Sequence, residues 1–227
     1  MRPAEVSVRV VNAKLPAVRV GYIGGGNDRV GHWLERMGVK VTDLSKVDLT
    51  DAVLSEFDTI VVGIFAMKFR AGLSEAMPRI HQWTHAGGTL VTLYHRPWDN
   101  WTPDETPPFR LEIGQPSLRW RVTDETAKVE YLQPDHSLFK TPNQIEDADW
   151  ANWHKERGLY FAKDWDDAYK PLISMRDPDE QPLTGAWLVA DVGKGRHVHT
   201  SLILHHQMEK LTPGAFRIMA NLLAIRG

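Results

Sequence analysis

The chain contains no cysteine. This excludes disulfides, thiolate metal ligands and a cysteine nucleophile, and it says little about the cellular compartment. No apolar run reaches the roughly 18 residues that a membrane-spanning helix needs, and the amino terminus lacks the basic, apolar and small-residue order of a signal peptide. We therefore expect a cytoplasmic protein with no membrane partner.

A basic stripe is also absent. The formal net charge is −2, and lysine and arginine are spread along the 227 residues. Nothing therefore gathers enough positive charge to neutralise a row of phosphates, and nucleic acid is not expected as a partner. A chain of this length buries roughly 70% of its unfolded surface, so it can hold a full core without covalent cross-links.

Short apolar runs alternate with helical patterns in the first hundred residues. Strands are predicted at residues 18–23, 39–44, 59–64 and 89–94, and helices at 29–37, 49–57 and 73–85. Residues 65–70 are expected to form a loop. Because strands that alternate with helices through short connections form right-handed crossovers, the sequence predicts a mainly parallel sheet. The fold class is therefore α/β, a three-layer αβα sandwich.

The second half of the chain is less regular. Residues 102–169 are rich in proline and aromatic residues, and we expect an irregular insertion there. A strand at residues 170–175 precedes a C-terminal β-hairpin, whose strands at 185–192 and 196–204 are joined by Gly193-Lys194-Gly195, and a last helix begins at Pro213. Residues 1–17 read as a linker or, from the alternation at 6–11, an edge strand. Residues 18–227 read as one domain, and a longer parent chain is left open.

The glycine run after the first strand raises the question of a nucleotide. Gly24-Gly25-Gly26 fits neither the dinucleotide fingerprint, because position 29 is arginine, nor the phosphate-binding loop, because no lysine with serine or threonine follows. A tight turn is the better interpretation, and we expect no cofactor.

Polar and aromatic residues follow the strands at one edge of the predicted sheet, where α/β proteins bind ligands. The candidate ligand-binding residues are His95, Arg96, Trp98, Asp99 and Trp101 after the fourth parallel strand, and His205 and His206 after the last strand. Tryptophans beside aspartate, arginine and histidine are typical of a sugar-binding surface, since a pyranose stacks on an indole while polar groups take its hydroxyls. They are equally typical of a packed core.

Histidines also raise the question of a metal. On the last strand, His197, His199 and His205 share one face by the two-residue period. A catalytic zinc site needs a further ligand, which His95, Asp135 or Glu156 would supply. No spacing matches a zinc signature, so packing is favoured over metal binding for these histidines.

Nucleophilic catalysis is not favoured either. A nucleophile elbow needs small neighbours for its sharp turn, and Tyr94-His95-Arg96-Pro97 offers none. Glu156 beside Arg157 has two interpretations, a general acid or an ordinary ion pair, and the ion pair is favoured.

Several segments together resemble a known family. They are Val20-Gly21-Tyr22-Ile23, Phe57-Asp58-Thr59-Ile60-Val61-Val62-Gly63, Gly87-Gly88-Thr89-Leu90-Val91, Arg121-Val122-Thr123-Asp124-Glu125, Pro134-Asp135-His136, Glu156-Arg157-Gly158-Leu159-Tyr160-Phe161, Asp177-Pro178-Asp179-Glu180-Gln181-Pro182-Leu183 and Pro213-Gly214-Ala215. From about Val18 onward the chain resembles the class I glutamine amidotransferase-like domain appended to some bacterial LmbE/PIG-L-type deacetylases. The resemblance implies a flavodoxin-like αβα sandwich and a PIG-L-type deacetylase domain as partner, in the same chain or another.

The chain departs from this family at the catalytic positions. The resemblance places the nucleophile elbow at Tyr94 or His95 and the late catalytic pair at His205 and Gln207. Because the chain has no thiol and has an amide where a carboxylate should hold the histidine, glutamine hydrolysis is not expected. The His-Pro-Asp-Asp zinc motif of the deacetylase is absent as well.

The sequence thus favours a non-catalytic accessory domain that binds a ligand, with carbohydrate as the class to test, or acts as a scaffold beside a deacetylase. The alternative is a small hydrolase with a divergent site built from His95, His205, His206 and Glu156, with or without a metal. A docking or homo-oligomerisation module is the third interpretation.

Overall fold

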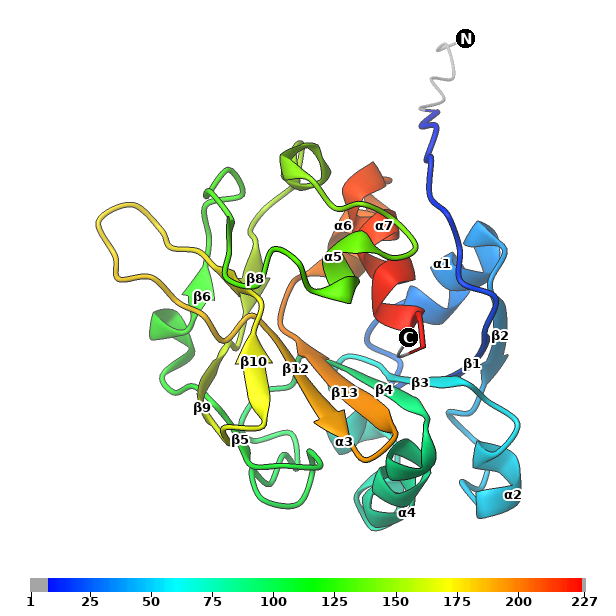
Figure 1. Ribbon diagram of the computed structural model, residues 1–227. Coiled ribbons are helices and arrows are strands. Elements are labelled where there is room, and N and C mark those ends of the chain that lie inside the picture. Colours follow the sequence, from blue (N-terminus) through cyan, green and yellow to red (C-terminus); the bar gives the residue numbers. More distant parts are fainter. Residues whose placement is uncertain (1–7, 226–227) are drawn as a thin grey trace, which may run out of the picture.

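The computed structural model describes residues 8–225. Its centre is a seven-stranded sheet in the order β2-β1-β3-β4-β13-β12-β10 (Figure 1). The strands are β1 (Arg19–Ile23), β2 (Lys40–Asp43), β3 (Thr59–Val62), β4 (Thr89–Leu93), β10 (Tyr169–Pro171), β12 (Trp187–Val192) and β13 (Gly195–Thr200). Strands β1 to β4 and β13 are parallel, whereas β12 runs antiparallel to β13 and β10 antiparallel to β12. The expected mainly parallel sheet and C-terminal hairpin are confirmed.

The central strands are apolar on both faces because helices cover both. Along β4, Val91 and Leu93 face one core, while Leu90 faces the other. Likewise Val61 of β3 faces the first core, and Ile60 faces the second. A strand buried on both sides loses the usual alternation of polar and apolar residues, which is why these runs read as continuously hydrophobic.

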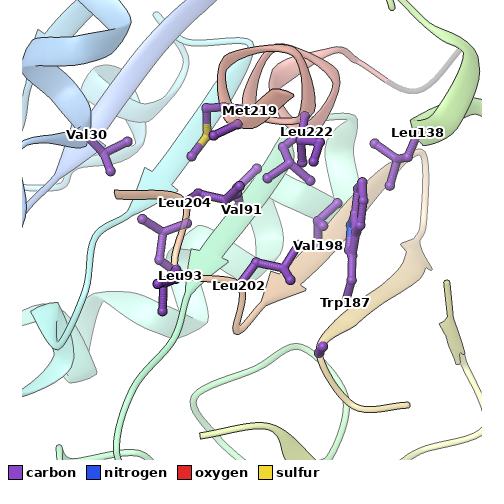
Figure 2. Close-up of a cluster of buried hydrophobic side chains, with 14 of the residues drawn as sticks. Val30, Val91, Leu93, Leu138, Trp187, Val198, Leu202, Leu204, Met219 and Leu222 are labelled. Atoms are coloured by element: carbon purple, nitrogen blue, oxygen red, sulfur yellow. The ribbon is translucent and has the colours of Figure 1, made fainter. Parts of the chain in front are cut away.

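Seven α-helices surround the sheet in the described part of the chain. They are α1 (Val30–Met37), α2 (Asp51–Leu54), α3 (Ala66–Phe69), α4 (Leu73–Ala86), α5 (Ser137–Lys140), α6 (Leu204–Glu209) and α7 (Pro213–Leu223). Helices α1, α6 and α7 cover one face, and α2, α3 and α4 cover the other (Figure 1). Figure 2 shows Met219 and Leu222 of α7 above Val91 of β4 and Val198 of β13. The three-layer αβα sandwich is therefore confirmed.

Helix α7 approaches the chain before it very closely. A Cβ atom built on Gly214 would lie 1.8 Å from the carbonyl oxygen of Asp149. Asp149 belongs to η2 (Asp147–Trp150), a 3-10 turn of the insertion. Only glycine fits at this crossing, so Gly214 lets the C-terminal helix dock on the insertion.

The insertion carries short regular elements of its own. These are β5 (Leu111–Ile113), η1 (Ser117–Arg119), β6 (Arg121–Val122), β7 (Glu130–Tyr131), η2, β8 (Gly158–Leu159) and β9 (Ala162–Trp165), along with α5. They form two-stranded pairs, β5 with β9 and β6 with β8, while β7 pairs with β11 (Ile173–Ser174) beyond the insertion. Most of the aromatic residues of this segment pack inward, so the insertion extends the core on the β10 side of the sheet.

Several expected elements differ from the structure; the helix expected at 49–57, for example, is only α2 (Asp51–Leu54). Strand β13 ends at Thr200, and α6 begins at Leu204, so His205 to Gln207 lie in a helix rather than at a strand end. The expected loop at 65–70 contains α3. The single strand expected at 170–175 is divided between β10 and β11, because the backbone leaves the main sheet after Pro171. Residues 8–17 contain no strand, and the rest of the proposed edge strand lies outside the described residues.

None of the helices in residues 8–225 combines the length and the apolar character needed to span a bilayer.

Candidate functional site

Aromatic rings from four segments gather at the edge of the sheet where β3 and β4 end. The members of this strand-end cluster are Phe65, Tyr94, Arg96, Trp98, Tyr160 and His205. Phe65 follows β3, the next three residues follow β4, Tyr160 comes from the insertion and His205 from α6. The ring of Tyr94 lies 5.5 Å from Phe65, 5.9 Å from Tyr160 and 5.7 Å from His205 between centroids. The segment after β4, where the resemblance predicted the nucleophile elbow, is thus packed with rings.

Arg96 is held rigidly in this cluster by Asp99. The carboxylate of Asp99 is fully buried and accepts hydrogen bonds from the backbone N–H and from Nε and Nη2 of Arg96, the last at 2.7 Å. The guanidinium lies 4.2 Å from the ring centroid of Phe65 and 5.8 Å from that of Trp98, within cation–π range. Burying Asp99 therefore fixes the loop that presents Trp98.

Trp98 is the exposed member of the cluster. Its exposed fraction is 54%, whereas Tyr94 is only 5% exposed. The indole stands edge-on to Tyr160, with 6.3 Å between the ring centroids. A large aromatic ring that is held in place and faces water at a strand-end edge is a candidate contact for a ligand.

Three polar groups near the cluster have few partners. The phenol of Tyr94 and the carboxylate of Glu156 form no hydrogen bonds within residues 8–225, although Lys155 Nζ lies 3.9 Å from Glu156. Nδ1 of His205 is enclosed and also lacks a partner in that part of the chain. Buried polar groups are normally hydrogen-bonded, so these three are the atoms here that a ligand or water would satisfy.

Burial shifts the pKa values of the same three groups. It raises the pKa of the Glu156 carboxyl and lowers that of His205 to about 4, because the charged form of each loses hydration. The pKa of the Tyr94 phenol is raised, first by burial and then by the negative charge of Glu156. At neutral pH, Tyr94 and His205 are therefore uncharged.

His95 and Trp101 lie beneath the cluster rather than on it. His95 is fully buried: its Nε2 accepts a hydrogen bond from the backbone N–H of Met67, so its Nδ1–H donates to the carbonyl of Leu93. The indole N–H of Trp101 donates to the carbonyl of Leu111. Neither residue keeps a polar atom for the ligand that was expected to contact it.

His197 and His199 take part in a chain of hydrogen bonds on the α4 side of the sheet. Its end is the Tyr160 carbonyl, which accepts from the Ser201 hydroxyl. Since that hydroxyl uses its hydrogen there, it accepts from His199 Nε2–H at 3.4 Å, and His199 Nδ1 accepts from the Thr92 hydroxyl at 2.9 Å. Thr92 then accepts from the Nε2–H of His197.

The Tyr169 hydroxyl begins this chain by donating to His197 Nδ1 at 2.6 Å. Each of the five side chains thus donates in one direction, and both imidazoles are neutral and carry hydrogen on Nε2. Every ring nitrogen is used, so neither histidine has a lone pair for a metal. Within residues 8–225, no group of three or more histidine and carboxylate side chains is placed to hold a metal ion. His205 does not share their face, because β13 has already ended.

Gln207 is part of a structural contact. Its Oε1 accepts from the backbone N–H of His154, and its Nε2 donates to the carbonyl of the same residue. In a helix, residues two apart point to opposite sides, so Gln207 and His205 do not form a pair. His206, half-buried beside His205, lies at a ring-centroid distance of 6.3 Å from it.

The strained backbone at this edge belongs to residues that the sequence did not single out. Phe65 and Tyr160 have φ values of 57° and 58°, in the left-handed region, whereas Tyr94 and His95 do not. The turn from β3 into α3 is the sharp one, and the expected elbow after β4 is not. Phenylalanine rarely adopts a left-handed backbone, so the sequence could not predict this conformation at Phe65. Tyr160 is one of many aromatic residues in the insertion, and nothing in the sequence distinguishes it from the others.

Comparison with known proteins supports the fold. No protein-family profile matches the chain, and no curated protein matches it in sequence. Among solved structures, the cytoplasmic protein STM3548 of Salmonella typhimurium is similar at 12% identity and a TM-score of 0.62, over 92% of this chain and 100% of that one. A putative GMP synthase component from Thermoplasma acidophilum is similar at 8% identity and a TM-score of 0.53, over 93% of this chain and 96% of that one.

A putative ThuA-like protein of Bacteroides uniformis is also similar, at 11% identity and a TM-score of 0.52, over 95% of this chain and 94% of that one. These likenesses place the chain in the class of α/β sandwiches with the class I glutamine amidotransferase-like fold. At such low identity they show the fold alone.

Proposed function

We propose that this protein is a non-catalytic, amidotransferase-like binding domain whose strand-end cluster takes a polyhydroxylated ligand of the carbohydrate class. The observation that carries the proposal is Trp98, a half-exposed indole on a loop locked by the buried Asp99. An indole presents an apolar face to the C–H face of a pyranose without losing much side-chain freedom. The uncommitted polar atoms of Tyr94 and Glu156 lie nearby to receive hydroxyl groups.

The absence of a nucleophile supports the non-catalytic part of the proposal. The chain has no cysteine, and Tyr94 is a neutral phenol whose pKa is raised by burial. A neutral phenol that forms no hydrogen bond to a base, as Tyr94 forms none within residues 8–225, is a weak nucleophile. Incubation with glutamine and with N-acetylated sugars should give no ammonia and no acetate above the buffer control, and turnover of either substrate would overturn this part.

Trp98→Ala tests the binding part. Glycan-array screening followed by calorimetry on the best sugar should show affinity falling at least about tenfold in the variant, because the stacking surface is lost. The melting temperature should stay within the small range of a surface substitution. Leu118→Ala is the matched control, since it removes an exposed apolar side chain that lies outside the cluster. Binding that survives in Trp98→Ala contradicts the proposed site.

The partner is proposed from sequence resemblance: a PIG-L-type deacetylase, to which this domain would present a sugar. Co-purification with a deacetylase encoded next to it tests this, and a genomic setting without any such enzyme argues against it.

A hydrolase is the second candidate, and Glu156 is the observation that favours it. Burial shifts the pKa of this carboxyl in the direction that a general acid requires, and it lies near a phenol and a neutral imidazole. Sugar-ester or glycoside hydrolysis that disappears in Glu156→Gln while sugar binding persists would establish this candidate over the first.

A further inference from the structure

A recess of about 550 Å³ lies in the insertion. It is formed by the loop between β6 and β7 and by the segment that runs from η2 towards β8. The charged and aromatic residues that line it are Glu125, Lys128, Asp147, Trp150, Trp153 and Arg157. None of them belongs to the strand-end cluster, so a ligand here would be separate from the one proposed above.

One of the residues that line this recess is a buried cation. Arg157 is 4% exposed and forms no ion pair with a carboxylate in residues 8–225. Its Nε and Nη2 donate to the carbonyl of Ala127 at 3.1 and 2.9 Å, and its Nη1 donates to the carbonyl of Trp150 at 2.6 Å. A guanidinium has five N–H groups, so two are left without an acceptor.

Burial leaves this charge incompletely compensated. It lowers the pKa of Arg157 to about 10, and the carboxylates of Asp124 and Glu125 offset this only in part. A buried charge is costly unless an opposite charge approaches it. A carboxylate that enters the recess would supply that charge and take the two remaining N–H groups in the paired geometry that guanidinium favours.

The aromatic wall is rigid and apolar. Trp150 and Trp153 lie with their ring centroids 5.2 Å apart, and the guanidinium of Arg157 lies 5.8 and 5.3 Å from them. Both indole N–H groups are already bonded, one to the hydroxyl of Tyr131 and the other to the carbonyl of Asp149. Only the carbon surfaces of these rings are left to meet a ligand.

Charges at the rim restrict the ligand further. Glu125, Asp147 and Lys128 are exposed, and none forms an ion pair within the described part of the chain. With Arg157, the lining holds two positive and two negative side chains. A simple anion would meet repulsion from the two acids, whereas a ligand that carries both a carboxylate and an ammonium group would meet an opposite charge at each end.

We propose that this recess binds a small zwitterion of the α-amino acid class, with its carboxylate on Arg157 and its ammonium group towards Glu125 and Asp147.

Thermal shift and calorimetry on the full chain with the twenty common L-amino acids test the proposal. At least one should bind with a measurable dissociation constant. Its N-acetyl derivative, which keeps the carboxylate but loses the ammonium charge and so resembles a peptide C-terminus, should bind at least about tenfold more weakly. Its decarboxylated amine should show no binding. Absence of binding by all twenty, or equal binding of the N-acetyl derivative, would overturn the assignment.

Substitutions locate the ligand. Arg157→Met should reduce affinity about 30-fold or more through loss of the buried charge. Because this variant also loses three hydrogen bonds, the exposed Glu125→Gln, which leaves the fold intact, provides an independent test and should weaken binding about threefold to tenfold. Glu130→Gln, an exposed acid outside the recess, is the matched control and should change nothing. Amino-acid binding that both Glu125→Gln and Arg157→Met retain at full strength would refute the site, and binding lost in Trp98→Ala would place the ligand at the strand-end cluster instead.

Discussion

Acidification below about pH 6.5 is expected to unfold this protein steeply, with a midpoint between about pH 4 and 5.5. The cause is a set of three fully buried histidines, His95, His197 and His199. Burial lowers the pKa of His95 to about 4 and that of His199 to about 3, and it lowers the pKa of His197 well below the usual value. All three are neutral in the folded state, and each must lose a hydrogen bond to accept a proton.

The direction of the effect follows from proton binding. In the unfolded chain these imidazoles titrate near pH 6.5. Below that pH the unfolded state therefore binds protons that the folded state does not bind. Their stabilising contribution is complete above pH 6.5 and decreases as the pH falls towards 4. Below pH 6.5, each imidazole lowers the free energy of unfolding by about 1.4 kcal/mol per pH unit, and three lower it by about 4 kcal/mol per unit. This is a large share of the roughly 5–15 kcal/mol that is typical of folded domains.

Thermal unfolding followed by circular dichroism at pH 7.5, 6.5, 5.5 and 5.0 measures this dependence. The free energy of unfolding should fall with a slope equivalent to at least three protons, because His205, whose pKa is also lowered by burial, adds to the effect of the three fully buried imidazoles. His199→Asn should reduce that slope by one proton, although it lowers stability at pH 7.5. His32→Gln is the matched control because His32 is exposed. A melting temperature that stays constant from pH 7.5 to 5.0 would show that the buried imidazoles do not control stability.

Gly214→Ala should be among the most destabilising single-methyl additions in this chain. The new Cβ would lie 1.8 Å from the carbonyl oxygen and 2.4 Å from the carbonyl carbon of Asp149, and backbone atoms cannot rotate away as a side chain would. Helix α7 must then separate from η2 and disturb the ion pair between Arg217 and Asp149, whose Nε and Oδ1 are 2.7 Å apart. Overpacking of this kind costs about 1–3 kcal/mol or more, and we expect the upper end of that range.

Chemical denaturation of Gly214→Ala and Gly26→Ala measures the difference. Gly26 has a φ of 80° and open space around its missing Cβ, so the alanine there meets only backbone strain of about 1 kcal/mol. Both variants add the same methyl group. Equal midpoints for the two would mean that the close approach of α7 to η2 adds no more than the backbone strain at Gly26, and would contradict the prediction.

The sheet could be predicted from sequence because its signals are local. Runs such as Thr59 to Ile64 are apolar, β-branched and bounded by helices, and these features alone specify a strand buried on both faces. The end of β13 could not be predicted, because the apolar residues Leu202 to Leu204 continue the strand pattern. In the structure, Leu202 forms an isolated β-bridge with Gly158, and Leu204 is the first residue of α6.

The candidate site was only partly predictable. Arg96 and Trp98 do converge with Tyr94 at the strand-end edge, as their positions after β4 suggested. His205 also reaches Tyr94, but from helix α6 rather than from the expected strand end. The inward positions of His95 and Trp101 depend on hydrogen bonds with the backbone of Met67 and Leu111, and no local sequence pattern reports those contacts. A shift of one residue decides whether a side chain faces the core or the solvent. The sequence pattern that predicts the facing side in a strand does not continue into the loop that follows it.

The row of side chains from Tyr169 to Ser201 ends on a backbone carbonyl, which has no hydrogen to pass on. This row therefore cannot conduct a proton between the interior of the sheet and the edge, although it contains two imidazoles. Its members cannot turn round, because the carbonyl can only accept a hydrogen bond and reversing any one member would set two hydrogens against each other at one junction. The row is therefore a fixed structural support rather than a proton relay, and it anchors the backbone of Tyr160 at this edge of the sheet.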